Sequence, residues 1–407
     1  MKILLSVCGS ISAYKSLDIA RGLINNGHEV KVILTKGALK FVVPEVFTYL
    51  GALDVYLDSD DFRYKNVLHV DLARWSDILV IAPLSANTLS RLARGEASDL
   101  LSSVFLAYES SKPIALFPAM NSLMLKHPFT QENIKELKKL KTLENIFISP
   151  TNSGVLACNE VGQGKLPSVD EIIALVPTLR TPFNELSLKK KIVITTGATI
   201  SPMDPVRYLS NSSSGITGYH LAISALKKGY NVVVIAGRNA VKDLDLLKKH
   251  PSYQLIRITT VSEMHHAVHA EIKNADAYLS AAAISDVEFD SSIHKIKKEC
   301  MTDTLQIKKA IDILKTVIEL QTPNLKIVGF AAETILSDDV LTKKYQSKPV
   351  DLLVATKVDN GMVSKEQLQG FNVDQATYRF VANGIISAET TIDKQNLGEI
   401  IFNHINF

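Results

Sequence analysis

Small polar residues that could bind a phosphate group follow two apolar stretches in the first half of the chain. Gly9 and Ser10 come directly after Lys2 to Val7, and the cluster Ser85-Ala86-Asn87-Thr88 follows the apolar run from Asp77 to Pro83. Hydroxyl groups and backbone N–H groups at the start of a helix can hold an anion. Helix capping by Ser85 or Asn87 would explain the second cluster without a ligand, and for the cluster alone this interpretation is favoured.

Three residues with acid–base or hydrogen-bonding side chains lie in the same half: His69, Asn121 and Cys158. Asn121 follows a predicted strand, and Cys158 lies in the glycine-rich segment Ser153 to Gly164, which predicts a mobile flap. Taken singly, His69 could be a half-buried histidine, Asn121 a turn residue and Cys158 a small apolar filler. Their combination is the stronger indication of function.

The second half contains another hydroxyl-rich loop, Asp204 to Gly215, which carries Arg207 and Asn211 before a predicted helix. The positively polarised start of that helix suits an anionic ligand, although a capped loop is the alternative. Lys295 begins a lysine run that could be surface charge only. His265 and His269 have the i, i+4 spacing of a metal-binding pair, but without a third ligand nearby an exposed helix face is favoured.

Two β-α-β patterns predict the elements that position these residues. The first comprises the strand Lys2 to Val7, a helix ending at Gly27 and the strand Val30 to Leu34. The second comprises the strand Ile192 to Thr196, a helix between Gly215 and Gly229, and the strand Val232 to Ile235. Such units build parallel sheets. We therefore predict an α/β fold with two doubly wound, mostly parallel-sheet, Rossmann-like domains, residues 1–188 and 189–407.

The composition narrows the function classes. The 407 residues are 46% hydrophobic and 21% charged with a net charge of +3, which is ordinary for a globular protein and argues against a nucleic-acid partner. The three cysteines, an odd and scattered number, favour a reducing compartment, and we expect a cytoplasmic protein. No apolar run approaches the ~20 residues that span a bilayer, so no membrane association is expected.

Residues 1 to about 180 resemble the flavin-dependent cysteine decarboxylases. The resemblance depends on Gly9-x-x-x-Ala13-Tyr14-Lys15, His69-x-x-Leu72-x-x-Trp75-x-Asp77, Pro118-Ala119-Met120-Asn121 and Ala157-Cys158. It implies an FMN cofactor and the substrate 4'-phosphopantothenoylcysteine, which is oxidised at its cysteine moiety, loses carbon dioxide and is reduced again. It further implies that Cys158 is the acid, that His69 assists the oxidation and that Asn121 holds the substrate carboxylate. The implied FMN contacts are Gly9, Ser10, Ser85, Ala86, Asn87 and Thr88.

Residues from about 190 to 407 resemble the phosphopantothenate-cysteine ligases, most specifically in the segment Asp204 to Gly215. That family joins 4'-phosphopantothenate to cysteine through an acyl-cytidylate made from CTP. The resemblance implies that Lys295, Lys344, Lys348 and Mg²⁺ neutralise the triphosphate, and that Arg207 and Asn211 hold the acyl intermediate and the pantothenate side. The other implied nucleotide-binding residues are Asp286, Ile311, Asp312, Ile313, Leu314 and Phe330. No metal ligands are identified.

The order of the two halves resembles the bacterial bifunctional enzymes of coenzyme A biosynthesis, which implies decarboxylase trimers and ligase dimers. Departures from the ligase pattern at Thr196 to Ser201, Ala310 to Asp312 and Thr356-Lys357 leave open a weakened ligase and the choice between CTP and ATP. In the first loop Cys8 replaces a serine of the family, and we expect it to be a buried filler. Two alternatives are a non-catalytic flavin-binding regulator and a tandem nucleotide-binding oxidoreductase, which would lack its G-x-G-x-x-G fingerprint.

Overall fold

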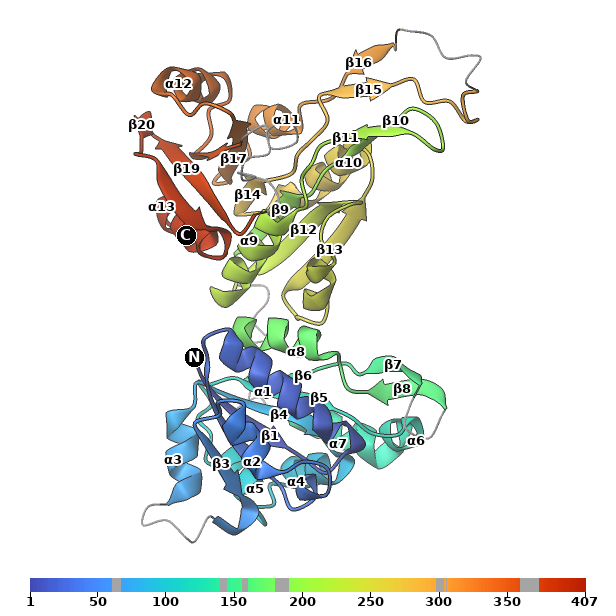
Figure 1. Ribbon diagram of the computed structural model, residues 1–407, viewed down its shortest axis with the longest axis vertical. Coiled ribbons are helices and arrows are strands. Elements are labelled where there is room, and N and C mark those ends of the chain that lie inside the picture. Colours follow the sequence, from blue (N-terminus) through green and yellow to red (C-terminus); the bar gives the residue numbers. More distant parts are fainter. Residues whose placement is uncertain are drawn as a thin grey trace. The chain divides into compact units, whose positions relative to one another are not determined.

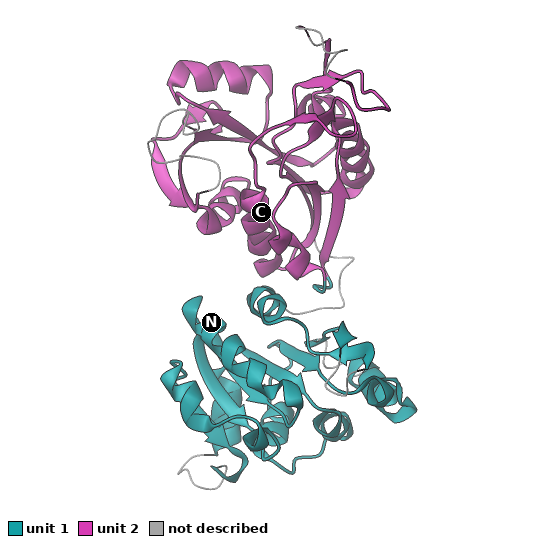
Figure 2. Cartoon of the chain, turned by 45° about the vertical axis from the view of Figure 1, so that its right-hand side comes forward, with its two compact units in different colours: residues 1–187, 249–251 teal, residues 188–248, 252–407 magenta. Residues whose placement is uncertain are grey.

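The chain forms two compact units in the computed structural model, residues 1–187 with 249–251 and residues 188–248 with 252–407 (Figure 2). The structure describes residues 1–60, 67–139, 145–155, 160–179, 190–297, 304, 306–358 and 373–407. The predicted domain boundary between residues 188 and 189 falls outside these ranges and stays a prediction. Within them, no helix combines the length and the apolar character needed to cross a bilayer.

A six-stranded parallel sheet in the order β3-β2-β1-β4-β5-β6 forms the centre of the first domain (Figure 1). Its strands are β1 (Lys2–Val7), β2 (Glu29–Leu34), β3 (Asp54–Leu57), β4 (Ile78–Leu84), β5 (Ile114–Pro118) and β6 (Ile146–Ile148). The chain winds outwards from β1 to β3 and then returns to β4 on the other side of β1. The carboxyl ends of β1 and β4 therefore form a topological switch point, where α/β sheets bind ligands.

Helices cover both faces of this sheet, and a β-hairpin follows it. The helical segments are η1 (Ile11–Tyr14), α1 (Lys15–Asn25), η2 (Ala38–Lys40), α2 (Pro44–Tyr49), η3 (Asp58–Asp60), α3 (Leu68–Trp75), α4 (Ala86–Arg94), α5 (Leu100–Leu106), α6 (Ser122–Lys126), α7 (Pro128–Lys139), α8 (Val169–Leu175) and η4 (Val176–Thr178). The predicted flap forms the hairpin of β7 (Asn152–Val155) and β8 (Val161–Lys165). Its residues 156–159 lie outside the described ranges.

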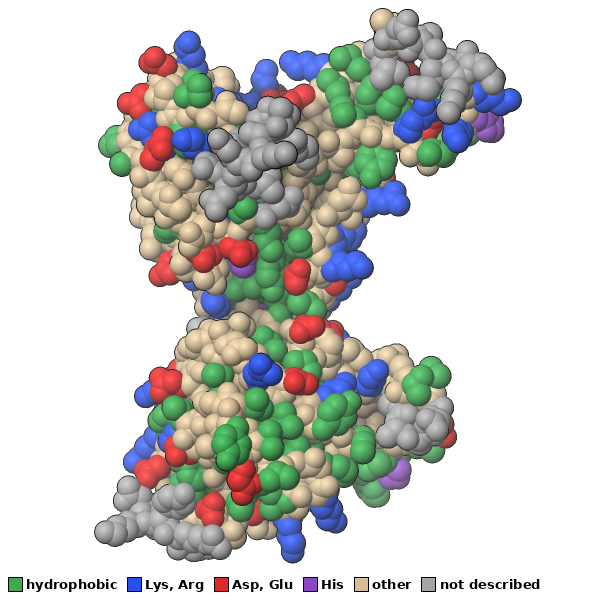
Figure 3. Space-filling view, in the orientation of Figure 1, with side chains coloured by type: hydrophobic (Ala, Val, Ile, Leu, Met, Phe, Trp, Pro, Cys, Tyr) green, Lys and Arg blue, Asp and Glu red, His purple; other side chains and the backbone are tan. Residues whose placement is uncertain are grey.

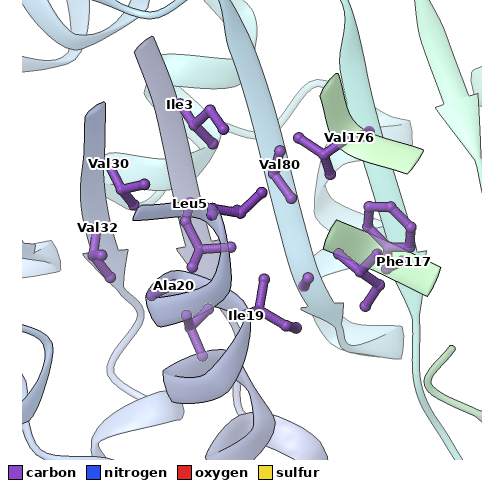
Figure 4. Close-up of a cluster of buried hydrophobic side chains, with 14 of the residues drawn as sticks. Ile3, Leu5, Ile19, Ala20, Val30, Val32, Val80, Phe117 and Val176 are labelled. Carbon is purple, nitrogen blue, oxygen red and sulfur yellow. The ribbon is translucent and has the colours of Figure 1, made fainter. Parts of the chain in front are cut away.

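The side chains of β1 alternate between two hydrophobic cores. Ile3 and Leu5 point to one core, which also contains Phe117 (Figure 4), whereas Leu4 packs in the core on the opposite face. Because both faces are buried, the strand needs apolar residues at almost every position, which is why Lys2 to Val7 could be predicted as a strand. Phe117 is completely buried and meets the edge of the Phe147 ring at a centroid distance of 6.2 Å.

The second domain contains a nine-stranded sheet in the order β13-β12-β9-β14-β17-β18-β19-β20, with β21 paired to β19. The neighbours are parallel from β13 to β18 and antiparallel beyond. The strands are β9 (Lys191–Thr196), β12 (Asn231–Gly237), β13 (Tyr253–Ile258), β14 (Ala277–Ser280), β17 (Lys326–Glu333), β18 (Leu352–Lys357), β19 (Gln375–Ala382), β20 (Ile385–Ile386) and β21 (Thr390–Asp393). Two doubly wound α/β domains are thus present, and the predicted fold class is confirmed.

Helical segments pack on this sheet, and two short ribbons form a projecting arm (Figure 1). The helical segments are α9 (Ile216–Lys227), η6 (Lys242–Leu247), α10 (Val261–Glu271), η7 (Ile272–Asn274), α11 (Ile313–Glu319), α12 (Asp338–Ser347) and α13 (Lys394–His404). The arm consists of β10 (Ile200–Pro202) paired with β11 (Tyr208–Ser210), and of β15 (Val287–Phe289) paired with β16 (Ile307–Lys309).

Local sequence patterns explain several features of this domain. Thr260 and Glu263 have the spacing of a capping box, and the box forms at the start of α10, where the Thr260 side chain accepts from the backbone N–H of Glu263 and the Glu263 carboxylate accepts from that of Thr260. Gly218 lets α9 lie close to β9, since a Cβ there would be 2.2 Å from Thr196 Oγ1. The apolar run from Ala275 to Ala283 predicts a longer strand than the structure forms, because β14 ends at Ser280 and Ala283 lies in the loop beyond it.

Replacement of Phe117 by alanine should destabilise the first domain by about 3–5 kcal/mol, because it leaves a cavity in the core beside Phe147. Urea unfolding followed by the fluorescence of Trp75, the single tryptophan, reports on this domain. Phe129 is 74% exposed, so Phe129→Ala is the matched control and should change stability by less than about 0.5 kcal/mol. Equal midpoints for the two variants would contradict the assignment of Phe117 to the core.

Candidate functional site

A cavity of about 590 Å³ lies at the switch point of the first domain. Four predicted cofactor contacts line it, Gly9 and Ser10 after β1 and Ser85 and Ala86 after β4, together with Asn121 after β5. The other lining residues are Ile11, Ser12, Tyr14, Lys15, Ala119, Met120, Met124, Val155, Gly164 and Lys165. Residues more than 100 positions apart in the sequence thus converge because three parallel strands end at the same edge of the sheet.

Hydroxyl groups and helix starts form one end of the cavity. Ser10 caps η1 and accepts from the backbone N–H of Ser12 at 3.4 Å, while Ser85 caps α4 and accepts from that of Thr88 at 3.2 Å. The capping interpretation of Ser85 is therefore correct, and the same residue also lines the cavity. Of the two remaining predicted contacts, Asn87 is exposed, whereas Thr88 is buried behind Ser85, and neither is a lining residue.

Asn121 and the β7-β8 hairpin form another part of the wall. The Asn121 side-chain oxygen accepts from the backbone N–H of Leu123 at 2.8 Å, so the amide group is held in one orientation. Met120 N–H donates to the carbonyl of Gly164 at 3.0 Å. Gly164 has a φ of +121°, and a Cβ there would lie 2.1 Å from the Met120 carbonyl oxygen. Only glycine permits this approach, which joins the hairpin to the segment that carries Asn121.

Two lysines give the cavity a positive character. Lys15 starts α1 and Lys165 ends β8, and no acidic residue is found among the described residues that line the cavity. Such a cavity favours an anionic ligand. The sequence interpretation did not select either lysine, although Lys15 stands in the Ala13-Tyr14-Lys15 signature. Nothing in the local pattern around Lys165 shows that it returns to the carboxyl end of β5.

The structure does not bring all three predicted decarboxylase residues to this cavity. His69 is half-buried in the first turn of α3 and is not a lining residue. In Figure 1, α3 lies on the side of the first domain away from α6 and the β7-β8 hairpin. Cys158 lies outside the described residues. Cys8, by contrast, is completely buried, and burial raises the pKa of its thiol to about 11, so it is an unreactive filler as expected.

In the second domain, backbone contacts gather several predicted ligase residues beyond β14. The Asn211 amide donates to the carbonyl of Ile284 at 3.1 Å, and Ala310 N–H donates to the carbonyl of Asp286 at 2.9 Å. The second contact places the stretch Ile311 to Leu314 beside Asp286. Within this stretch Ile313 is completely buried, so only its backbone can face a ligand. Phe330 is half-buried on the neighbouring strand β17.

Lys344 on α12 and Lys348 directly after it, which are both predicted to bind the triphosphate, are paired with carboxylates. Lys344 pairs with Glu333 at the end of β17, and Lys348 Nζ lies 2.6 Å from Asp312 Oδ2. The Asp312 carboxylate also caps α11 through the backbone N–H of Lys315 at 3.1 Å. Burial alone would raise the pKa of Asp312, but the bonds from Lys348 and Lys315 outweigh it and lower the pKa. The two lysines are thus held at the carboxyl end of the sheet.

Arg207 and Lys295 lie in the arm instead. The Arg207 guanidinium donates to Asp204 Oδ2 at 2.6 Å and to the carbonyl of Ile296 at 2.7 Å, and Ile296 N–H donates to Asp204 Oδ2 at 3.1 Å. Lys295, next to Ile296, is exposed, and Lys and Arg side chains gather on this arm (Figure 3). Arg207 therefore joins the two ribbons, while its predicted contact with a substrate stays a prediction.

The Asp204 carboxylate is the centre of this connection. Its burial would raise its pKa, but hydrogen bonds from Val206, Arg207 and Ile296 outweigh that effect and hold the pKa well below its usual range. Because the pKa is lower in the folded protein, ionised Asp204 stabilises the fold above its ordinary pKa. This contribution is lost as the pH falls through the lowered pKa.

The histidine pair of α10 also forms, with the His265 and His269 rings 4.2 Å apart. His269 Nε2 lies 3.0 Å from Thr316 Oγ1 on α11. In the part of the chain that the structure describes, no group of three or more His, Cys, Asp or Glu side chains could hold a metal ion.

Comparison with known proteins identifies both halves. Residues 1–180 match the family model described as flavoprotein, and residues 187–406 match the DNA/pantothenate metabolism flavoprotein C-terminal domain. The coenzyme A biosynthesis bifunctional protein CoaBC of Bacillus subtilis is 35% identical over 364 residues, which cover 88% of this chain and 86% of that protein. The chain belongs to this bifunctional family. The Escherichia coli member is 32% identical over 415 residues, covering 99% of this chain and 96% of that protein.

Membership of the bifunctional coenzyme A biosynthesis family confirms the predicted enzyme, which combines a phosphopantothenoylcysteine decarboxylase with a phosphopantothenate-cysteine ligase. It also confirms that the first domain is a flavoprotein. A solved structure of a mutant PPC decarboxylase with pantothenoylaminoethenethiol is 34% identical to this chain. The match covers 43% of this chain and 95% of the decarboxylase chain, with a TM-score of 0.39.

The substitution Asp204→Asn should release the segment that carries Lys295 from the β10-β11 ribbon, since a neutral amide cannot pair with Arg207 and accept from Ile296 equally well. Trypsin should then cut after Arg207, Lys295 or Lys297 several times faster, as measured by mass spectrometry of the fragments. Asp290→Asn, which removes an ion pair with Lys308 between two exposed side chains, is the control. Identical cleavage rates in both variants would contradict the role of Asp204.

Proposed function

We propose that the first domain of this bifunctional enzyme uses FMN to convert 4'-phosphopantothenoylcysteine to 4'-phosphopantetheine. The second domain uses CTP to join 4'-phosphopantothenate to cysteine through an acyl-cytidylate. The observation that carries the first assignment is the cavity at the switch point, where Gly9, Ser10, Ser85 and Ala86 meet Asn121 and two lysines without an acidic lining residue among those described. We further propose a cytoplasmic location.

The described residues of the cavity suit FMN. A volume of about 590 Å³ is within the range of roughly 300–1,000 Å³ typical of cofactor and ligand sites. The hydroxyl groups of Ser10, Ser12 and Ser85 and the start of α4 suit a phosphate group. Met120, Met124 and Val155 provide apolar walls for a flat ring system. When bound, FMN supplies an electron acceptor and donor that allows an unactivated carboxylate to leave as carbon dioxide.

The chain itself positions the substrate and transfers its protons. With its oxygen held by Leu123 N–H, the Asn121 amide presents its NH₂ group as a donor for the substrate carboxylate. Lys165 lies beside Asn121 in the same cavity and suits the phosphate of the substrate. Cys158, which follows β7 and precedes β8 in the sequence, would supply the proton that completes the reduction.

His69 can take part in the decarboxylase reaction only if it reaches the cavity of a second copy of the chain. Since α3 lies on the side of the domain away from the hairpin, we propose that His69 of one copy lines the cavity of another and assists the oxidation step. The decarboxylase trimers implied by the family resemblance would place the cavity at such a subunit boundary. Ligase dimers are proposed on the same basis.

In the second domain, we propose that the triphosphate of CTP takes the place of carboxylates as the partner of two lysines. Lys344 and Lys348 are already held at the carboxyl end of the sheet by Glu333 and Asp312. Lys295 would reach the triphosphate from the arm, with Mg²⁺ neutralising the remaining charge. The proposed nucleotide contacts are Asp286, Ile311, Asp312, Ile313, Leu314 and Phe330, and the proposed contacts of the acyl intermediate are Arg207 and Asn211.

Two variants should separate the activities of the purified chain. With phosphopantothenate, cysteine and Mg²⁺, CTP should give CMP, and ATP should give less AMP. Lys295→Gln should abolish CMP release but leave carbon dioxide release from supplied phosphopantothenoylcysteine unchanged, because the charge is lost in one domain only. Cys158→Ser should leave CMP release unchanged, and the first domain should stop at an oxidised, decarboxylated product instead of forming 4'-phosphopantetheine. Unchanged turnover in either variant would remove that residue from its proposed role.

A further variant tests how the phosphate of the substrate is recognised. Lys165→Met should raise the KM for 4'-phosphopantothenoylcysteine about tenfold, because a charge-assisted hydrogen bond is lost. The KM for pantothenoylcysteine, which lacks the phosphate, should not change. Lys126→Met is the control, since Lys126 is exposed on α6 and is not a lining residue. A similar rise for both substrates would show that Lys165 does not contact the phosphate.

A further inference from the structure

A buried polar cluster lies directly behind Ser85. Arg91, one helical turn after Thr88 on α4, points its Nη2 at Thr88 Oγ1 at 3.5 Å. Thr88 Oγ1 in turn lies 3.1 Å from Ser85 Oγ, which lines the cavity. Arg91 itself is not a lining residue. A row of hydrogen bonds therefore leads from a half-buried guanidinium through two hydroxyl groups to the cavity.

The carboxylate of Asp99 fixes the position of Arg91. One Asp99 oxygen pairs with Arg91 Nη1, and the other accepts from the backbone N–H of Ser102 at 2.8 Å, where it caps α5. The Arg91 and Asp99 side chains are only 19% and 8% exposed. Arg91 Nη1 also donates to Ser98 Oγ at 3.2 Å. Because so many bonds hold it, the guanidinium is a fixed donor toward Thr88.

The numbers of donors and acceptors on these groups determine which atom donates in each of the hydrogen bonds. A guanidinium has no acceptor, so Thr88 Oγ1 must accept from Arg91. The Thr88 hydroxyl hydrogen is then available to Ser85 Oγ or to the sulfur of Cys8, with which Thr88 also forms a hydrogen bond. Burial raises the pKa of Cys8 to about 11, so the sulfur remains a protonated thiol and a weak acceptor. Ser85 Oγ is the better acceptor.

The Ser85 hydroxyl hydrogen then has no other acceptor among the described residues, so it can donate into the cavity. Its oxygen accepts from the backbone N–H of Thr88 at 3.2 Å, and it accepts a second bond when the Thr88 hydroxyl rotates to donate. Without an anion the hydrogen bond between the two hydroxyl groups can have the opposite direction, with Ser85 donating to Thr88, because hydroxyl hydrogens rotate freely. An anion in the cavity selects the direction in which each group donates toward it, and hydrogen bonds in such a row strengthen one another.

We propose that Arg91 is a positioning residue that makes the Ser85-Thr88 pair a donor to the phosphate of the bound flavin, and that it thereby gives the cavity its preference for FMN over riboflavin. This inference rests on the proposed FMN site of the first domain. It concerns a residue that neither the sequence interpretation nor the cavity lining identifies.

Flavin titration of the full chain, freed of bound flavin, tests this role without any measurement of activity. Quenching of flavin fluorescence gives the Kd for FMN and for riboflavin. In Arg91→Met the Kd for riboflavin divided by the Kd for FMN should fall about tenfold, because only FMN carries the phosphate and only its binding is weakened. Arg91→Lys, which keeps a donor, should retain part of the preference. Arg94→Met, an exposed position on the same helix, should leave the ratio unchanged.

An unchanged ratio in Arg91→Met, or an equal loss of affinity for both flavins, would overturn the inference, since a purely structural role affects both ligands. If Arg91→Met does not fold, Thr88→Val provides the same test, because it removes the hydroxyl group that connects Arg91 to Ser85. An unaltered chain that binds neither flavin would overturn the proposed FMN site itself, which is a different result from the loss of the phosphate preference alone.

Discussion

The divergence of the chain at the carboxyl ends of β1 and β4 is the constraint on which the first site depends. At this point the strand order reverses, so the segments after the two strands turn to opposite faces of the sheet and leave a hollow between them. The first turns of η1 and α4 begin there, each with backbone N–H groups that have no partner within the helix. Ser10 and Ser85 satisfy some of these groups and add hydroxyl donors. The topology therefore supplies hydrogen-bond donors that suit an anion before any charged side chain is added.

The rest of the cavity consists of elements brought to this hollow. The β7-β8 hairpin reaches it because Gly164 allows backbone contact with Met120, and the hairpin brings Lys165 beside Asn121. Behind Ser85, Asp99 holds Arg91 against Thr88. Two lysines thus line the cavity and the half-buried Arg91 lies behind one of its serines, although the three residues belong to three separate segments.

The second domain has a similar sheet topology, but its charged side chains are arranged differently. Its strand order also reverses next to the first strand, between β9 and β14. Lys344 and Lys348 are paired with Glu333 and Asp312, whereas no acidic residue is found among the described lining residues of the first cavity. A highly charged triphosphate can compete with carboxylates for two lysines, while a flavin phosphate with fewer charges needs donors that are not already paired. The same fold thus presents two different arrangements of charged side chains through its loops.

The sequence by itself determined the elements whose signals are local. Buried parallel strands require continuous apolar runs, and caps require a Ser, Thr or Asp at a fixed spacing, so β1, β9, the α10 capping box and the cap at Ser85 could be predicted directly. The tertiary structure alone decided which distant residues meet. It brought Lys165 and Asn121 to one cavity, placed α3 with His69 away from the β7-β8 hairpin and joined Arg207 to the carbonyl of Ile296. These contacts depend on strand order and hairpin packing, which are set by long-range burial and leave no periodic signal in the sequence.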